Sequence, residues 1–204
     1  MAKLKGPLFS LGASQQLGKT LVFFGWKGLN VVREYVVPSN PRTTGQVTQR
    51  GYLTTAVAYI HTAQGHAANP TDAEDIQAYA LLASVTQTAT TWFNQLVRQI
   101  IDQLVASKLY QVMRNGHLTP GVDKLTFQIV TMDHSGAGVT AGEIKYGTSK
   151  TALINTLACT AAELQAGKDI TGLTTGVKYY AKWQATVPAG YIGCWSGIYY
   201  GVPI

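Results

Sequence analysis

Hydrophobic periodicity changes sharply along this chain near residue 122. Upstream, between about Thr88 and Leu109, apolar residues recur at the spacing of one helix face. Downstream that spacing disappears, and short alternating runs of apolar and polar residues are separated by turn signals. The chain is therefore predicted to be α+β in two parts: extended strands and three helices over residues 1–118, and an all-β sandwich over residues 122–204.

Capping signals place the first two helices. Thr43 and Gln46 form a capping-box pattern directly after a turn signal, so a helix is predicted from about residue 43 to 64. A second helix is predicted from about residue 71 to 84. Three acids stand at its start, where they complement the helix dipole; a cation site is the less favoured interpretation of the same cluster. These acids are Asp72, Glu74 and Asp75.

The third helix, about Thr88 to Leu109, carries the widest apolar stripe. The stripe comprises Trp92, Phe93, Leu96, Val97, Ile100, Ile101, Leu104 and Val105. The opposite face is polar and comprises Asn94, Gln95, Arg98, Gln99, Asp102 and Gln103. A stripe this wide has to be covered. Packing of the three helices on one another is the favoured interpretation, and a subunit interface would use the same residues. Turn signals at Asn115-Gly116 and Thr119-Pro120-Gly121 then predict a linker.

The first 38 residues are predicted to be extended. Glycines separate short apolar pieces, such as those at residues 8–9, 21–24, 29–32 and 35–37. Glycine at this density argues against a helix. The pieces would pair as β-hairpins within the chain or add to the sheet edge of a neighbouring chain.

Positive charge is concentrated where these strands meet the first helix. Residues 1–50 hold seven Lys/Arg against Glu34 alone, which gives +6, equal to the net charge of the whole chain. Trp26 to Arg50 joins the extended arm to the helices, and six of its residues form a candidate assembly interface: Trp26, Lys27, Arg33, Arg42, Gln46 and Arg50. Neutral Gln, Thr and Asn fill the gaps between the charges, which favours a protein partner over nucleic acid. Nucleic-acid binding remains the alternative hypothesis.

Motifs for chemistry lack the context they need. Ala13 to Thr20 satisfies the loose Walker A pattern, but the residues that follow favour a strand where a phosphate loop would open a helix. The four histidines are scattered, and no GxSxG elbow is present. The protein is therefore predicted not to be an enzyme and to hold no cofactor or metal. Two buried thiols are expected at Cys159 and Cys194, although one bridge between them is possible.

Low charge content is the informative feature of the composition. Apolar residues make up 46% and charged residues only 13%, which suits a protein that buries surface against copies of itself; a monomer with a Thr/Gln/Asn-rich surface is the alternative. No secretory signal or membrane-spanning run is evident. Synthesis in the cytoplasm followed by assembly is expected.

The C-terminal part resembles a fibronectin type III domain. Strands are predicted at Leu125 to Met132, Glu143 to Tyr146, Ala152 to Leu157, Val177 to Ala185, and Gly193 to Gly201. Leu173 precedes a turn, and Tyr179 follows six residues later, as in that family. The resemblance implies that Tyr179 is the tyrosine corner. No tryptophan stands on the second strand, so the core is expected to use Trp183 or Trp195.

The N-terminal part is similar to uncharacterised structural proteins of tailed-bacteriophage virions. The shared pattern is Trp26-Lys27-Gly28, Arg33, Pro38, Asn40-Pro41-Arg42-Thr43, Gln46 and Arg50. The resemblance implies a location in the virion, as a capsid, neck or tail component. Expected partners are further copies of the chain and other virion proteins, with the sandwich displayed as decoration.

Overall fold

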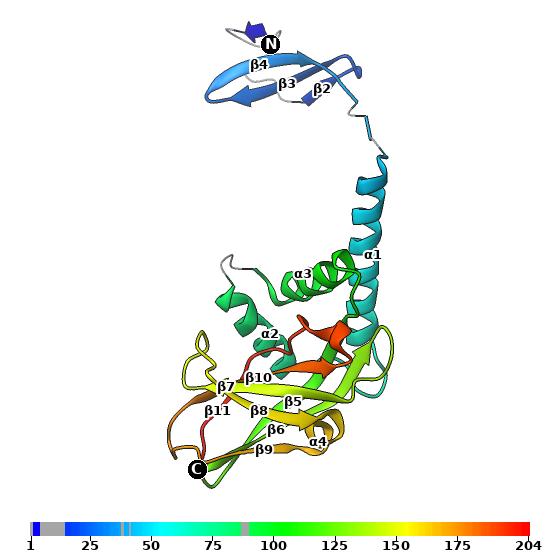
Figure 1. Ribbon diagram of the computed structural model, residues 1–204. Helices are drawn as coiled ribbons and strands as arrows, with labels where there is room; N and C mark the ends of the chain where they lie inside the picture. The colour runs from blue at the N-terminus through cyan, green and yellow to red at the C-terminus, as the bar shows by residue number, and fades with distance from the viewer. Residues whose placement is uncertain (1, 5–14, 38, 41, 87–89) are drawn as a thin grey trace. The chain divides into compact units, whose positions relative to one another are not determined.

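A computed structural model describes residues 2–4, 15–37, 39–40, 42–86 and 90–204 of the chain (Figure 1). Over these residues the protein forms three antiparallel sheets and four α-helices, which confirms the mixed α+β class. The chain divides into two compact units, Met1–Thr43 and Thr44–Ile204. The helices thus share a unit with the C-terminal strands. The boundary expected at residues 118–122 lies inside this second unit.

Four short strands form one sheet in the first unit. They are β1 (Ala2–Leu4), β2 (Gln15–Leu17), β3 (Leu21–Trp26) and β4 (Leu29–Glu34), in the spatial order β1-β4-β3-β2. Lys27 and Gly28 form the two-residue turn between β3 and β4, with φ of 48° and 76°. Positive φ at both central residues matches the turn to the twist of the flanking strands. The predicted apolar piece at residues 8–9 lies outside the described residues.

The Walker A-like segment ends in a hairpin turn. Ala13 and Ser14 lie outside the described residues, whereas Gly18, Lys19 and Thr20 connect β2 to β3. The Thr20 N–H donates to the Leu17 carbonyl at 3.0 Å. A strand follows this turn, so the helix N-terminus that a phosphate loop requires is not formed there.

Seven strands form two further sheets in the second unit. They are β5 (Gln111–Gly121), β6 (Lys124–His134), β7 (Ala141–Gly147), β8 (Asn155–Thr160), β9 (Lys168–Thr171), β10 (Tyr179–Val187) and β11 (Tyr199–Gly201). The orders are β11-β10-β7-β8 and β5-β6-β9. Phe127 and Ile129 from the smaller sheet share one buried core with Ile144 and Trp183 from the larger, so the sheets pack face to face. The short helix α4 (Ala161–Ala166) links β8 to β9, and a 3-10 turn at Ala189–Tyr191 follows β10.

The three longer helices, α1 (Thr44–Gln64), α2 (Ala73–Val85) and α3 (Trp92–Val105), share a second core. Ile60, Tyr79 and Ile100 are its large fully buried members. Val112 of β5 and Ile198 close this core from the sheet side. The apolar stripe of α3 is therefore covered within the chain from Trp92 to Leu104, as the favoured interpretation predicts, whereas Val105 at its end is 57% exposed.

The polar face of α3 is partly buried too. Gln95, Gln99 and Gln103 recur every four residues and are all buried. The Gln99 side-chain oxygen accepts from the Trp195 N–H at 2.8 Å, and the Gln103 amide donates to the Ile192 carbonyl at 3.2 Å. Gln99 and Gln103 thus bind the irregular backbone that runs into β11, and α3 is packed on two sides.

The predicted linker at residues 115–121 is wrong, because those residues belong to β5. β5 and β6 form a hairpin whose register runs from Gln111 opposite His134 to Gly121 opposite Lys124. Asn115 has φ of 52°, a conformation that asparagine tolerates. The Asn-Gly pair therefore bends the backbone within β5, and the strand continues beyond it.

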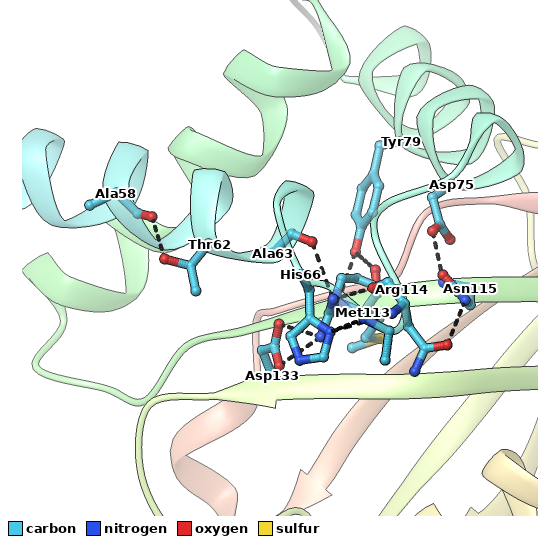
Figure 2. Close-up of polar contacts among 12 residues, drawn as sticks. Ala58, Thr62, Ala63, His66, Asp75, Tyr79, Met113, Arg114, Asn115 and Asp133 are labelled. Carbon is cyan, nitrogen blue, oxygen red and sulfur yellow. Dashed lines mark hydrogen bonds and ion pairs between the residues drawn. The ribbon is translucent and has the colours of Figure 1, made fainter.

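Buried polar groups join the helices to the sheets (Figure 2). The Tyr79 hydroxyl on α2 donates to the Met113 carbonyl and accepts from the Met113 N–H. Arg114 is fully buried; its guanidinium donates to the Ala63 and Asn69 carbonyls and pairs with Asp133 at 3.0 Å. These side chains fix the position of β5 beneath α1 and α2.

Across the described part of the chain, no helix is both long and apolar enough to span a membrane.

Candidate assembly surface

Within the described residues, the sheet of the first unit has an apolar face that no buried core covers. The register pairs Trp26 with Leu29, Phe24 with Val31, and Val22 with Arg33, so these side chains point to the same side of the sheet. We call Val22, Phe24, Trp26, Leu29 and Val31 the open apolar face. Trp26 is 56% exposed and Leu29 46%; among the described residues up to Val37, only Val31 is buried. The apolar face of a sheet is normally buried against a second layer of structure.

Further apolar side chains of this unit are exposed beyond the hairpin. Leu17 on β2 is 60% exposed, and Val36 and Val37 after β4 are 68% and 71% exposed. Isolated exposed apolar residues are ordinary on protein surfaces. In this unit, however, exposed apolar residues are numerous: Leu17 pairs with Leu21 on the sheet face opposite Trp26, and Val36 and Val37 follow the sheet. Large exposed apolar patches mark interaction sites.

The candidate residues Trp26, Lys27 and Arg33 lie on this β3–β4 hairpin. Trp26 ends β3, and Lys27 stands in the turn next to it. Arg33 lies near the other end of β4, with its guanidinium 5.5 Å from the centre of the Phe24 ring. The hairpin thus presents an apolar face with a cation at each end. Reasoning from charge found the cations and Trp26 but missed Val22, Phe24, Leu29 and Val31, which only the strand register places together.

The candidates Arg42, Gln46 and Arg50 lie around the start of α1. All three are exposed. Gln46 and Arg50 are four residues apart, so they share a face of the helix. The first buried residue of α1 is Ala56; the preceding residues of this helix are exposed, except for Tyr52, which is half-buried.

Tyr179 makes a local structural contact at the start of β10. Its hydroxyl accepts from the Thr174 N–H at 3.2 Å, the backward contact to the backbone that defines a tyrosine corner. Leu173 beside it is buried, and Trp183 fills the core between the sheets. Of the two tryptophans expected there, Trp195 packs instead against the helical core.

The acids at the start of α2, in the described chain, serve structural contacts. Among the described residues, no group of three or more His, Cys, Asp or Glu is arranged to hold a metal ion. The three acids at the start of α2 have different partners. Asp72 and Asp75 form a capping box, whereas Glu74 pairs with His117 at 2.8 Å.

Cys159 and Cys194 are both free and buried, so they do not bridge. Burial raises the pKa of the Cys194 thiol to about 11. A thiol held protonated in this way is a poor nucleophile.

The sequence matches no protein-family model and no curated protein.

Proposed function

We propose that the protein is a structural component of a bacteriophage particle that assembles as repeated copies through its N-terminal unit. The observation that carries the proposal is the open apolar face. A sheet that leaves Trp26 and Leu29 about half exposed needs a covering layer. A second copy of the same sheet provides one with matching shape and composition, and homo-oligomers commonly use such self-complementary patches.

Polar groups around this sheet would set the register between copies. Arg33 and Lys27 flank the open apolar face, and Arg42, Gln46 and Arg50 follow it along the chain. Arginine forms bidentate contacts with carboxylates and carbonyls, which makes it suited to interfaces between proteins. Burial of apolar surface would supply most of the association energy, and the contacts of these polar groups would make the association specific.

The assignment to a virion rests on the sequence pattern from Trp26 to Arg50, which is similar to that of tailed-bacteriophage structural proteins. Low charge content and the exposed N-terminal sheet are consistent with a subunit made for assembly. In such a particle, other virion proteins would be the remaining partners, and the second unit would be displayed.

A fibronectin type III-like sandwich is the fold we propose for the displayed strands. Counted from β5, the first, second and fifth strands form one sheet, and the third, fourth, sixth and seventh form the other. This division supports an immunoglobulin-like Greek key. The Tyr179 contact to Thr174 supports it as well. The tryptophan of the core stands on the sixth strand, as Trp183.

Oligomeric state tests the assembly. We expect the full-length protein to form large, symmetric oligomers by light scattering and electron microscopy, and these should persist at high salt. Trp26→Ala combined with Leu29→Ala should shift the protein to smaller species. Arg42→Ala and Arg50→Ala should each weaken assembly and leave the second unit folded, as judged by near-ultraviolet circular dichroism.

A matched control removes exposed apolar groups from the second unit. Val122 and Ile154 are 74% and 82% exposed, so Val122→Ala with Ile154→Ala should leave the oligomers intact. A monodisperse wild-type monomer at high concentration would overturn the proposal. Binding to DNA that falls steeply between low and moderate salt, without assembly, would support the nucleic-acid alternative.

A further inference from the structure

Three lysines and three aromatic residues form a row on the larger sheet of the second unit. The row, which we call the basic-aromatic row, comprises Lys145, Lys178, Tyr180, Lys182, Trp195 and Tyr200. The pairing of the strands brings these residues together, since Lys182 lies opposite Lys145 and Tyr180 lies opposite Tyr200. Its side chains lie on the sheet face opposite the core between the sheets, because Ala181 and Trp183, the intervening residues of β10, point into that core. Tyr180 and Trp195 pack in part against the helical core.

The lysines of this row are poorly neutralised. Lys182 lies 4.0 Å and Lys145 5.1 Å from the Trp195 ring centre, so two ammonium groups face one indole. Glu143 pairs with Lys145 at 3.3 Å. Within the described chain, neither Lys178 nor Lys182 forms an ion pair with a carboxylate. Burial and the nearby Lys145 lower the pKa of Lys182. A partly buried, uncompensated cation of this kind is suited to an anionic ligand.

A hollow opens beside the row, between α2 and β11. It has a volume of about 420 Å³ and is lined by Gln77, Ala80, Leu81, Ser84, Lys150 and Tyr200. Lys150 reaches across it and donates to the Ser84 hydroxyl at 3.2 Å. A second hollow of about 240 Å³ adjoins it and shares Gln77 and Tyr200. The lining combines an ammonium, an amide, hydroxyls and an aromatic ring, as sites for small polar ligands do.

We propose that this hollow and the basic-aromatic row bind an acidic glycan, a saccharide chain that carries carboxylates. Lys150 and Lys178 would bind the carboxylate of a sugar in the hollow. Gln77 and the Tyr200 hydroxyl would bond to its hydroxyls. Lys182 and Lys145 would bind the carboxylate of a sugar further along the row. Charge-assisted hydrogen bonds of this type are the stronger ones in polar recognition.

The geometry favours a glycan over the other polyanions. Single-stranded nucleic acids stack their bases on open aromatic faces, but here lysine ammonium groups stand over the rings of Trp195 and Tyr200. Acidic peptides usually add along a strand edge or fill a helix groove, whereas this row lies on a sheet face, along β10 and across to β7 and β11. The site lies wholly within Thr44–Ile204 and is independent of the assembly surface.

Calorimetric titration of the full-length protein tests the site. At about 0.15 M salt, where long-range attraction is screened, an oligogalacturonate should bind, and a neutral maltooligosaccharide of equal length should not. Lys178→Gln and Lys182→Gln should each weaken binding roughly tenfold, the size expected for loss of one charged hydrogen bond. Tyr200→Ala should weaken it as well.

Lys108→Gln is the matched control, because Lys108 is an exposed lysine after α3 and its loss changes the net charge equally. It should leave the affinity unchanged. No binding of oligogalacturonate would overturn the proposal. So would equal binding of poly-glutamate or single-stranded DNA with the same dependence on Lys178 and Lys182, since the row would then recognise charge alone.

Discussion

Asp75 shows how one side chain serves three elements at once. On α2 its carboxylate accepts from the Asp72 N–H at 3.2 Å and completes the capping box. The same carboxylate accepts from the N–H groups of Asn115 and Gly116, at 2.7 and 3.0 Å, and from the Tyr199 hydroxyl at 2.7 Å. Burial raises the pKa of Asp75, and these donors oppose the rise. The residue therefore joins α2, β5 and β11 around one acceptor.

Asp75→Asn is predicted to destabilise the second unit by about 2–3 kcal/mol, because an amide group would face donors and leave at least one of them unpaired. Denaturant unfolding at fixed protein concentration measures the loss. Glu74→Gln changes the neighbouring acid, whose side chain is 63% exposed in its pair with His117, and should cost less than about 0.5 kcal/mol. Equal effects of the two substitutions would contradict the role of Asp75.

At the scale of elements, the β3–β4 hairpin determines whether the open apolar face forms. Its turn requires positive φ at Gly28, 76°, which costs a residue with a side chain about 1–2 kcal/mol. Gly28→Ala should therefore loosen the hairpin and raise the dissociation constant of the oligomer roughly tenfold. Sedimentation at several concentrations measures this shift.

Gly25→Ala provides the comparison within the same hairpin. Gly25 lies in β3, its φ is not positive, and a Cβ there would meet no atom within 4 Å. Oligomers of this variant should dissociate as the wild type does. If Gly25→Ala impaired assembly as strongly as Gly28→Ala, the turn conformation would not be the cause.

Elements with strong local signals were predictable, and elements fixed by distant partners were not. α1 begins at Thr44, within one residue of the prediction, because turn and capping signals lie in adjacent sequence. β5 was missed because its Asn-Gly and Pro-Gly pairs normally mark turns; an edge strand tolerates Pro120 there. Asp75 was recognised only as a helix-start acid, since its partners on β5 and β11 are remote in sequence. The open apolar face required the register of β3 and β4.

For the whole molecule, the two units are expected to differ in what stabilises them. Thr44–Ile204 contains two buried cores joined by hydrogen-bonded polar groups such as Tyr79 and Arg114. In Met1–Thr43 Val31 is the one buried hydrophobic residue among those described. The first unit should therefore depend on association, and the second should not.

Thermal unfolding at several protein concentrations separates these two sources of stability. In the full-length protein, a transition that involves the first unit should move to higher temperature as concentration rises, because association stabilises the folded form by mass action. A variant that lacks residues 1–43 should be monomeric and should unfold in one transition that is independent of concentration. Its near-ultraviolet spectrum should retain the signal of Trp183, which is packed in the core between the sheets. Unfolding temperatures of the full-length protein that do not change with protein concentration would contradict this division of stability. So would a truncated variant that fails to fold.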